Sequence, residues 1–292
     1  MRKVPRTHSY YLNVFQQMID SIRVFARRAK RTVKGDTIDR PAFFLHIPKC
    51  GGASIRAALR LAFGLRSGIQ VDLRGNVHHD AFFRLDSAAS KKVADQLGVP
   101  LYEHREQVLL YQMGNRYNTK KLISGHFLFS EVAYQEHHDT YAFITLLRDP
   151  VERWYSNYFY NRDKDSDHFA VEDSLADCIE SSRGRFMGSL ITRSLAGTNC
   201  EEESMVARAI ENVAKFDVVG VLEDLGKFKS DVRDLLGASI DIPVRNTSPT
   251  PAHQRGKEIT PEIHRKVVEL CQPDQVVYDY VVTNVLSTSR TA

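Results

Sequence analysis

The chain has 292 residues, of which 42% are hydrophobic and 26% charged, and its formal net charge is +4. This composition is ordinary for a folded soluble protein, and the length is enough for one large α/β domain. The charge is too small to indicate nucleic-acid binding. The four cysteines are scattered without a C-x-x-C pair, which argues against a zinc site or a disulfide framework and fits a reducing compartment.

Residues 1–40 are predicted to form a basic amphipathic extension that precedes the domain of residues 41–292. They contain ten Lys or Arg and three Asp or Glu, a local charge of +7, so the remainder carries 4 − 7 = −3. Apolar residues recur at helical spacing between Tyr11 and Ala26. Three interpretations stay open for this helix: docking on its own domain, peripheral contact of residues 1–34 with an anionic membrane, or contact with a partner subunit.

The chain shows no run of 18 uninterrupted apolar residues and no signal-peptide pattern at its N-terminus. We therefore expect a cytoplasmic protein, either free or peripheral at the inner membrane surface. The sequence does not indicate the oligomeric state.

The stretch from Phe43 to Ser54 combines a predicted strand at 42–47, a glycine-containing turn and a predicted helix at 53–63. Glycines let the backbone approach an anion closely, and a helix N-terminus carries partial positive charge. Lys49 adds a cation at the rim, so the loop is predicted to hold a phosphorylated ligand. An ATP-type loop places its lysine after the glycines, whereas Lys49 precedes Gly51 and Gly52.

Residues 64–120 form an insert that mixes basic, histidine and aromatic side chains. Two interpretations stay open: an acceptor-binding region near the cleft, or a solvated helical excursion. The next predicted strand, 121–124, leads through Gly125 to His126. We interpret His46 as structural, and we consider His78 and His79 as candidates for a second proton-handling group.

A second anion site is predicted where the apolar run 141–147 meets a helix at 150–161. Asp149 suits the N-cap, Pro150 the first helical position, and Glu152 completes a capping-box pattern. Arg148 then lies at a strand end, and Ser156 lies about two turns into the helix. A guanidinium and a hydroxyl so placed can converge on one phosphate.

The remaining elements are a helical region at 203–214 and a strand at 216–221. The predicted strands are continuously apolar, which is typical of a parallel sheet buried on both faces. We therefore predict an α/β fold of three layers, with a parallel sheet flanked by helices. Ligands bind such sheets at the carboxyl ends of the strands, where both anion motifs fall.

Both motifs resemble those of the carbohydrate sulfotransferases that use 3′-phosphoadenosine 5′-phosphosulfate (PAPS). The order Pro-Lys-x-Gly-Gly-x-Ser at residues 48–54 is similar to their 5′-phosphosulfate loop, and residues 147–158 are similar to their 3′-phosphate segment. The branch that the chain resembles contains the heparan sulfate 2-O-sulfotransferase-like and the uronyl and chondroitin sulfotransferases. Weaker similarity covers residues 122–127, residues 217–225, Arg245–Ser248 and the helix near Tyr278. The resemblance implies the P-loop-like sulfotransferase fold.

The resemblance also implies roles for individual residues. His126 matches the catalytic histidine of this branch and would act as general base, while Lys49 would stabilise charge on the leaving group. Nucleotide-binding residues would come from the loop and from the second motif: Lys49, Cys50, Gly51, Gly52, Ala53, Ser54, Arg148 and Ser156. The co-substrate would be PAPS, the product 3′-phosphoadenosine 5′-phosphate (PAP), and the acceptor a hydroxyl of a glycan or glycoconjugate. No metal is expected.

Two alternatives stay open beside this interpretation. Cys50 and Ala53 stand where threonines are often found in the family, so the chain could be a non-catalytic nucleotide- or anionic-glycan-binding protein. A nucleotide-dependent kinase is the other, although the position of Lys49 before the glycines disfavours it.

Overall fold

The computed structural model describes residues 38, 40–63, 69–71, 77–79, 82–84, 87–114, 122–163, 170–198, 200–242, 256 and 258–287. The predicted N-terminal helix and the Arg245–Ser248 segment lie outside these residues. Within them, no helix has the length and apolar character needed to cross a lipid bilayer.

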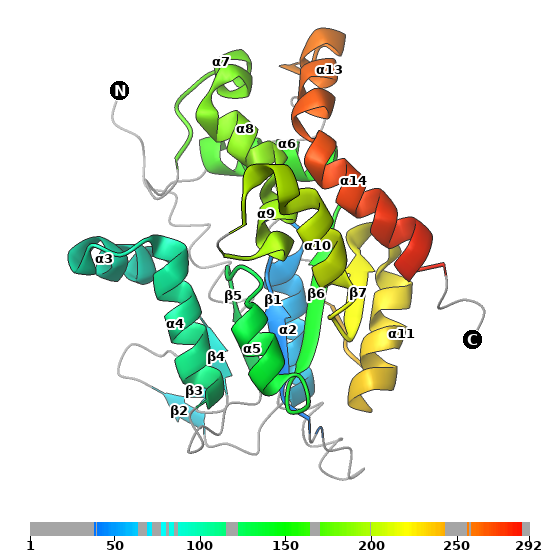
Figure 1. The fold of residues 1–292 in the computed structure, drawn as a ribbon. Coiled ribbons are helices and arrows are strands. Elements are labelled where there is room, and N and C mark those ends of the chain that lie inside the picture. The colour runs from blue at the N-terminus through cyan, green and yellow to red at the C-terminus, as the bar shows by residue number, and fades with distance from the viewer. Residues whose placement is uncertain are drawn as a thin grey trace.

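A five-stranded sheet in the order β4-β5-β1-β6-β7 forms the centre of the molecule, and each neighbouring pair is parallel (Figure 1). Its strands are β1 (Ala42–Leu45), β4 (Phe82–Arg84), β5 (Leu122–Gly125), β6 (Ala142–Leu147) and β7 (Val218–Val221). Every residue of β1, β5, β6 and β7 is buried, as their continuous apolar character predicts. The predicted parallel α/β architecture is confirmed.

Helices cover both faces of the sheet. One face packs with Phe44 and Ile144 against α2 (Gly52–Phe63) and α11 (Leu225–Leu236). The other packs with Phe43 and Phe143 against helices from later in the chain and from the insert. These are α4 (Leu101–Gly114), α5 (Glu131–His137), α9 (Leu190–Ala196), α10 (Met205–Val213) and α14 (Gln272–Tyr280). Because neighbouring residues of a strand point to opposite faces, the two clusters alternate along each strand.

A separate cluster lies around α6 (Pro150–Asp163), with Trp154, Tyr158 and Phe159 fully buried. It packs α6 against α7 (Leu175–Glu180), α8 (Ser182–Gly188) and α13 (Pro261–Leu270). Trp154 donates its indole N–H to the Gly184 carbonyl oxygen at 3.0 Å. This packing fixes the helix that carries the second predicted anion site.

Part of the insert belongs to the sheet and to the core beside it. It contributes β4, the antiparallel pair β2 (Ile69–Val71) and β3 (Val77–His79), α3 (Ser87–Leu97) and α4. In Figure 1 the teal α3–α4 pair lies at the β4–β5 edge of the sheet, and α11 lies at the β7 edge. Of the two interpretations left open for the insert, a solvated helical excursion does not describe β4 and α4, since β4 pairs with β5 and Leu109 of α4 is fully buried. The acceptor-binding interpretation stays a prediction.

Element boundaries differ from the predicted ones by two residues at most for the four predicted strands. The strand expected at 216–221 begins at Val218, because Phe216 still donates its N–H to Val213 at the end of α10. The helical region expected at 203–214 consists of a short turn, η1 (Glu202–Ser204), followed by α10.

Candidate active site

Four of the parallel strands have their carboxyl ends on the same side of the sheet, and a polar residue follows each of these ends. We call this side the carboxyl edge. His126 follows β5, Lys49 lies in the loop after β1, Arg148 follows β6, and Glu223 lies in the turn after β7. Because the strands lie in the order β5-β1-β6-β7, the four residues lie in the order in which they are named here along the carboxyl edge. The structure thus brings the two predicted anion motifs and the predicted base to one side of the molecule.

The loop after β1 has a backbone conformation suited to an anion. Lys49 has φ 69° and Gly51 φ 74°, both in the left-handed region, which a non-glycine residue such as Lys49 rarely adopts. Ser54 and Ile55 donate their N–H groups to the Gly51 carbonyl oxygen at 3.0 and 3.2 Å and so begin α2. The N–H groups of Gly52 and Ala53 open that helix, where no intrahelical acceptor exists for them.

Gly52 is required by close packing against His46. A Cβ atom at residue 52 would lie 1.8 Å from Cδ2 and 2.0 Å from Nε2 of the His46 imidazole. The His46 ring also packs against the His126 ring, tilted by 35° with centroids 4.3 Å apart, and stacks on the Phe44 ring at 5.9 Å. His46 therefore connects the loop with the residue predicted to be the base.

Lys49 and Arg148 are neighbours at the carboxyl ends of β1 and β6. The Arg148 Nη1 atom donates to the Lys49 carbonyl oxygen at 3.4 Å, and its Nη2 lies 3.4 Å from Glu152. The Lys49 ammonium lies 3.6 Å from the centroid of the Tyr160 ring, a cation–π contact. The two predicted cations thus lie against one helix, α6.

Ser156 belongs to the same face of α6. Glu152, Ser156 and Tyr160 follow one another at intervals of four residues, and such residues share one helix face. Glu152 contacts Arg148 at one end of this row, and Tyr160 contacts Lys49 at the other. Ser156 lies between these two residues along the row, and its role as a partner of Arg148 in holding a phosphate stays a prediction.

Of the two hydrogen bonds that a capping box at the N-terminus of α6 predicts, the structure contains one. Asp149 accepts the N–H of Glu152 at 2.8 Å. The N–H of Asp149 donates to Glu223 at 3.0 Å. The prediction that the Glu152 side chain would accept this N–H is therefore wrong. Glu152 pairs with Arg148 instead, and Glu223 also accepts the hydroxyl of Tyr278 at 3.0 Å. The end of β7 and the C-terminal helix α14 thus both reach the second anion site.

The His126 ring has a defined tautomer. Its Nδ1 lies 2.8 Å from the carbonyl oxygen of His46. A carbonyl only accepts, so Nδ1 carries a proton, and in the neutral ring the lone pair resides on Nε2. The main chain of His126 is held by Arg105 of α4, whose Nη1 donates to the His126 carbonyl oxygen at 3.0 Å. This arrangement fixes the direction of the ring, and the role of His126 as general base stays a prediction.

The Cys50 side chain does not face the predicted anion site. Its thiol is 1% exposed, lies in the core cluster, and donates to the Pro48 carbonyl oxygen at 3.9 Å. Burial raises the pKa of Cys50 to about 12, partly opposed by Arg153 and Arg148, so the thiol stays neutral. Its N–H donates within the turn to Ile47. Cys50 therefore fills the core beneath the loop, and this does not support its expected contact with the nucleotide.

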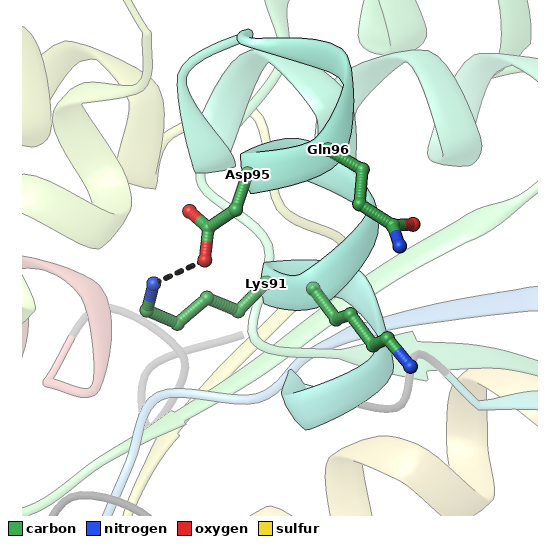
Figure 2. A pocket seen from close by; sticks show the side chains of 4 residues that line it. Lys91, Asp95 and Gln96 are labelled. Carbon is green, nitrogen blue, oxygen red and sulfur yellow. Dashed lines mark hydrogen bonds and ion pairs between the residues drawn. The ribbon is translucent and has the colours of Figure 1, made fainter.

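A hollow on the surface of α3 lies apart from these residues (Figure 2). It is lined by Lys91, Lys92, Asp95 and Gln96 of this one helix, and Lys91 and Asp95 form an exposed pair at 2.6 Å. Such i, i+4 pairs are common on solvated helices, and none of the predicted site residues lies in the hollow.

Three residues of the site were not predicted from the sequence. Tyr160 could have been found, since it follows Ser156 by four residues on the same helix. Glu223 follows the predicted strand 216–221, where a site residue is expected. Arg105 gave no such signal, because only the packing of α4 places it beside His126.

The fold and the residues that follow the strands define an α/β protein with two candidate anion-binding motifs at the carboxyl ends of β1 and β6. Comparison with protein families assigns it further: the chain belongs to the sulfotransferase family, whose model matches residues 39–281. Family membership makes it a PAPS-dependent sulfotransferase. No curated protein sequence matches the chain.

Proposed function

We propose that the protein transfers the sulfuryl group of PAPS to a hydroxyl of a glycan or glycoconjugate, with His126 as general base. The observation that carries this proposal is the shared edge, where the loop, Arg148 and the oriented His126 ring lie together. The acceptor class comes from the resemblance to the heparan sulfate 2-O-sulfotransferase-like and uronyl or chondroitin branch.

The proposed step is an in-line displacement at sulfur. Nε2 of His126 takes the proton of the acceptor hydroxyl as its oxygen bonds to sulfur, and the bond from sulfur to the bridging oxygen breaks. The electron pair goes to the 5′-phosphate of PAP. By analogy with phosphoryl transfer, catalysis depends on positioning and on charge stabilisation.

The loop and the second motif divide the nucleotide between them. Lys49 and the N–H groups at the start of α2 would hold the 5′-phosphosulfate end, and the long lysine stem lets the ammonium leave the Tyr160 ring. Arg148 and Ser156 would hold the 3′-phosphate, the group that distinguishes PAPS from ATP. No metal takes part in this scheme.

The direct test measures release of PAP from PAPS across a panel of glycans, with wild-type protein and with Lys49→Ala. We expect acceptor-dependent turnover in the wild type and a loss of about 10²-fold or more in the variant, since Lys49 stabilises charge formed in the transition state. Arg148→Ala is expected mainly to weaken PAP binding.

The same measurement separates the alternatives. A non-catalytic binding protein would bind PAP and release none from PAPS with any acceptor, and a kinase would bind ATP with Mg²⁺ irrespective of the 3′-phosphate. Equal rates in wild type and Lys49→Ala would contradict the proposed role of the loop.

The cytoplasmic location and the membrane contact of residues 1–34 stay predictions. Flotation of the full chain with anionic and neutral vesicles tests the contact. Salt-sensitive binding to anionic vesicles alone is expected for a basic helix at the membrane surface.

A further inference from the structure

His46 directly follows β1, and its main chain continues the pairing of β1 with β5. Its N–H donates to the Gly125 carbonyl oxygen at 3.0 Å, and its carbonyl oxygen lies 2.8 Å from Nδ1 of His126. Any residue except proline could supply these two main-chain groups. The hydrogen bond that orients the His126 ring therefore does not depend on the side chain at residue 46.

The His46 side chain makes contacts of a different kind. Its ring lies against the His126 ring, with centroids 4.3 Å apart, and it stacks on the Phe44 ring at an interplanar angle of 16°. It also packs so closely on Gly52, the first residue of α2, that a Cβ atom there would lie 1.8 Å from its Cδ2. The imidazole thus contacts the start of α2 on one hand and the ring of the proposed base on the other.

A hydrogen bond at Nδ1 fixes one atom of the His126 ring, and the ring can still tilt about that bond. The last torsion of a histidine side chain has broad minima, so one contact does not fix the direction of Nε2. A second contact on the ring restricts this tilt. The His46 ring supplies such a contact, and Phe44 supports the His46 ring in turn.

We propose that His46 is a positioning residue, whose imidazole holds the His126 ring in the orientation from which Nε2 accepts the proton of the acceptor. This inference rests on the proposed role of His126 as base, and it goes beyond the structural role that the sequence indicates for His46. Because the same ring packs on Gly52, the orientation of the base also depends on the nucleotide loop. His46 itself takes up no proton in this account.

The first measurement detects the orientation of the His126 ring without any reaction. The full chain is labelled with ¹⁵N at histidine, and NMR spectra are recorded well above the pH range in which histidine titrates, so that the rings are neutral. Neutral histidine in water prefers the Nε2–H tautomer, whereas the bond to the His46 carbonyl oxygen requires Nδ1–H. His126→Asn identifies the His126 signals among those of the 11 histidines.

We expect the Nδ1–H tautomer for His126 in the wild type and a mixture of tautomers in His46→Ala. Turnover of PAPS should fall by about 10- to 100-fold in this variant, because a small displacement of a reacting group costs that much. PAP affinity should stay at the wild-type value, since the lost ring contacts the base and holds no phosphate. If His46→Ala does not fold, His46→Leu replaces it, which fills the space without a flat group.

His46→Gln distinguishes positioning from proton transfer. Its side chain ends in a planar amide of similar reach, which can pack on the His126 ring but cannot exchange a proton near neutral pH. We expect it to keep the Nδ1–H tautomer and most of the turnover. The control is His138→Ala, which removes a ring stacked on Tyr134 with centroids 4.9 Å apart and is expected to change neither quantity.

Wild-type turnover in His46→Ala would overturn the proposal, and so would lower turnover with an unchanged His126 tautomer. Equal losses in His46→Gln and His46→Ala would overturn it as well, because they would indicate that His46 transfers a proton. The tautomer is measured without PAPS or acceptor. A failure of the sulfotransferase scheme, which would appear as no PAP release by the wild type, is therefore seen separately.

Discussion

The His126 imidazole is oriented by the donation from its Nδ1 to the His46 carbonyl oxygen. In His126→Asn the side-chain amide can still donate to that oxygen but offers no basic lone pair. We expect turnover to fall by about 10²- to 10⁴-fold, the range of general base catalysis, with PAP affinity unchanged. Steady-state kinetics and a PAP titration measure the two quantities.

His138 provides the matched control for that substitution. Its Nδ1 lies 3.0 Å from the Tyr134 carbonyl oxygen, a contact of the same kind at the end of α5. His138→Asn is expected to retain wild-type turnover. A normal rate in His126→Asn would show that another group takes the acceptor proton.

Gly52 packs against the His46 ring, which in turn contacts the ring of the proposed base, His126. In Gly52→Ala the new methyl group would overlap the His46 ring, which must then move away from both the loop and His126. We expect both PAP binding and turnover to fall. The control is Gly226→Ala in α11, where the nearest atom to a Cβ is an Asp224 oxygen at 3.5 Å and no loss is expected.

Removing His46 tests whether the steric clash is the cause. In the double variant Gly52→Ala, His46→Ala, the methyl group has room, so PAP binding should return towards the wild-type value. A double variant that binds no better than Gly52→Ala would show that the loop itself tolerates no side chain at residue 52.

At the scale of elements, the buried pair Arg153–Asp274 joins α6 to α14. Both side chains are fully buried with a closest approach of 3.4 Å, and Asp274 also accepts the N–H groups of Ile191 and Thr192 at 3.0 and 2.8 Å. Asp274→Asn leaves the arginine charge unpaired. We expect a loss of about 3–5 kcal/mol in the free energy of unfolding, measured by urea titration.

The exposed pair Arg265–Glu269 serves as the comparison. Its side chains are mostly in solvent, so Glu269→Gln should change stability by less than about 1 kcal/mol. In Arg153→Met, Asp274→Asn neither side chain carries a charge, and part of the stability lost in Asp274→Asn should return. Equal losses for the buried and the exposed pair would contradict this account.

Elements with strong local signals could be predicted from the sequence. The apolar runs at 42–47 and 141–147 contain strands whose odd- and even-numbered residues are both buried, one set on each face of the sheet. Asp149 caps α6 through its own side chain. The edge strand β4 has only three residues and no such run. Contacts between distant elements, such as Glu223 with the Asp149 N–H, depend on which strands are neighbours, and no local pattern specifies that.

The same distinction applies to the site. Lys49, Arg148 and His126 could be located because each follows a predicted strand, and parallel strands end at one edge. That Cys50 points into the core could not be read from a loop motif, since it depends on the packing around the loop. Arg105 comes from an insert with no recognisable motif, and its position follows from the buried face of α4.

At the scale of the whole molecule, the interior holds neutral thiols that resist ionisation. Burial raises the pKa of both Cys50 and Cys271 to about 12 from the ordinary value of 9.0, although nearby Arg153 opposes the shift. Above pH 9 the unfolded chain releases these protons and the folded protein keeps them. The folded state then binds more protons, so its stability is complete below pH 9 and falls as pH rises towards 12.

Between pH 8 and pH 10 we expect the free energy of unfolding to fall by about 1.4 kcal/mol for each thiol. The unfolded thiol loses its proton mainly above its ordinary pKa of 9.0, so the fall corresponds to one proton over about one pH unit. Urea titrations at pH 8, 9 and 10 measure this slope. Burial also raises the pKa of Tyr155 to about 12, but its ordinary value of 10.0 delays that contribution to higher pH. The double variant Cys50→Ala, Cys271→Ala starts from a lower stability and should lose distinctly less of it over the same interval. If its slope equals that of the wild type, other groups cause the alkaline destabilisation, because the two thiols are then no longer present to contribute.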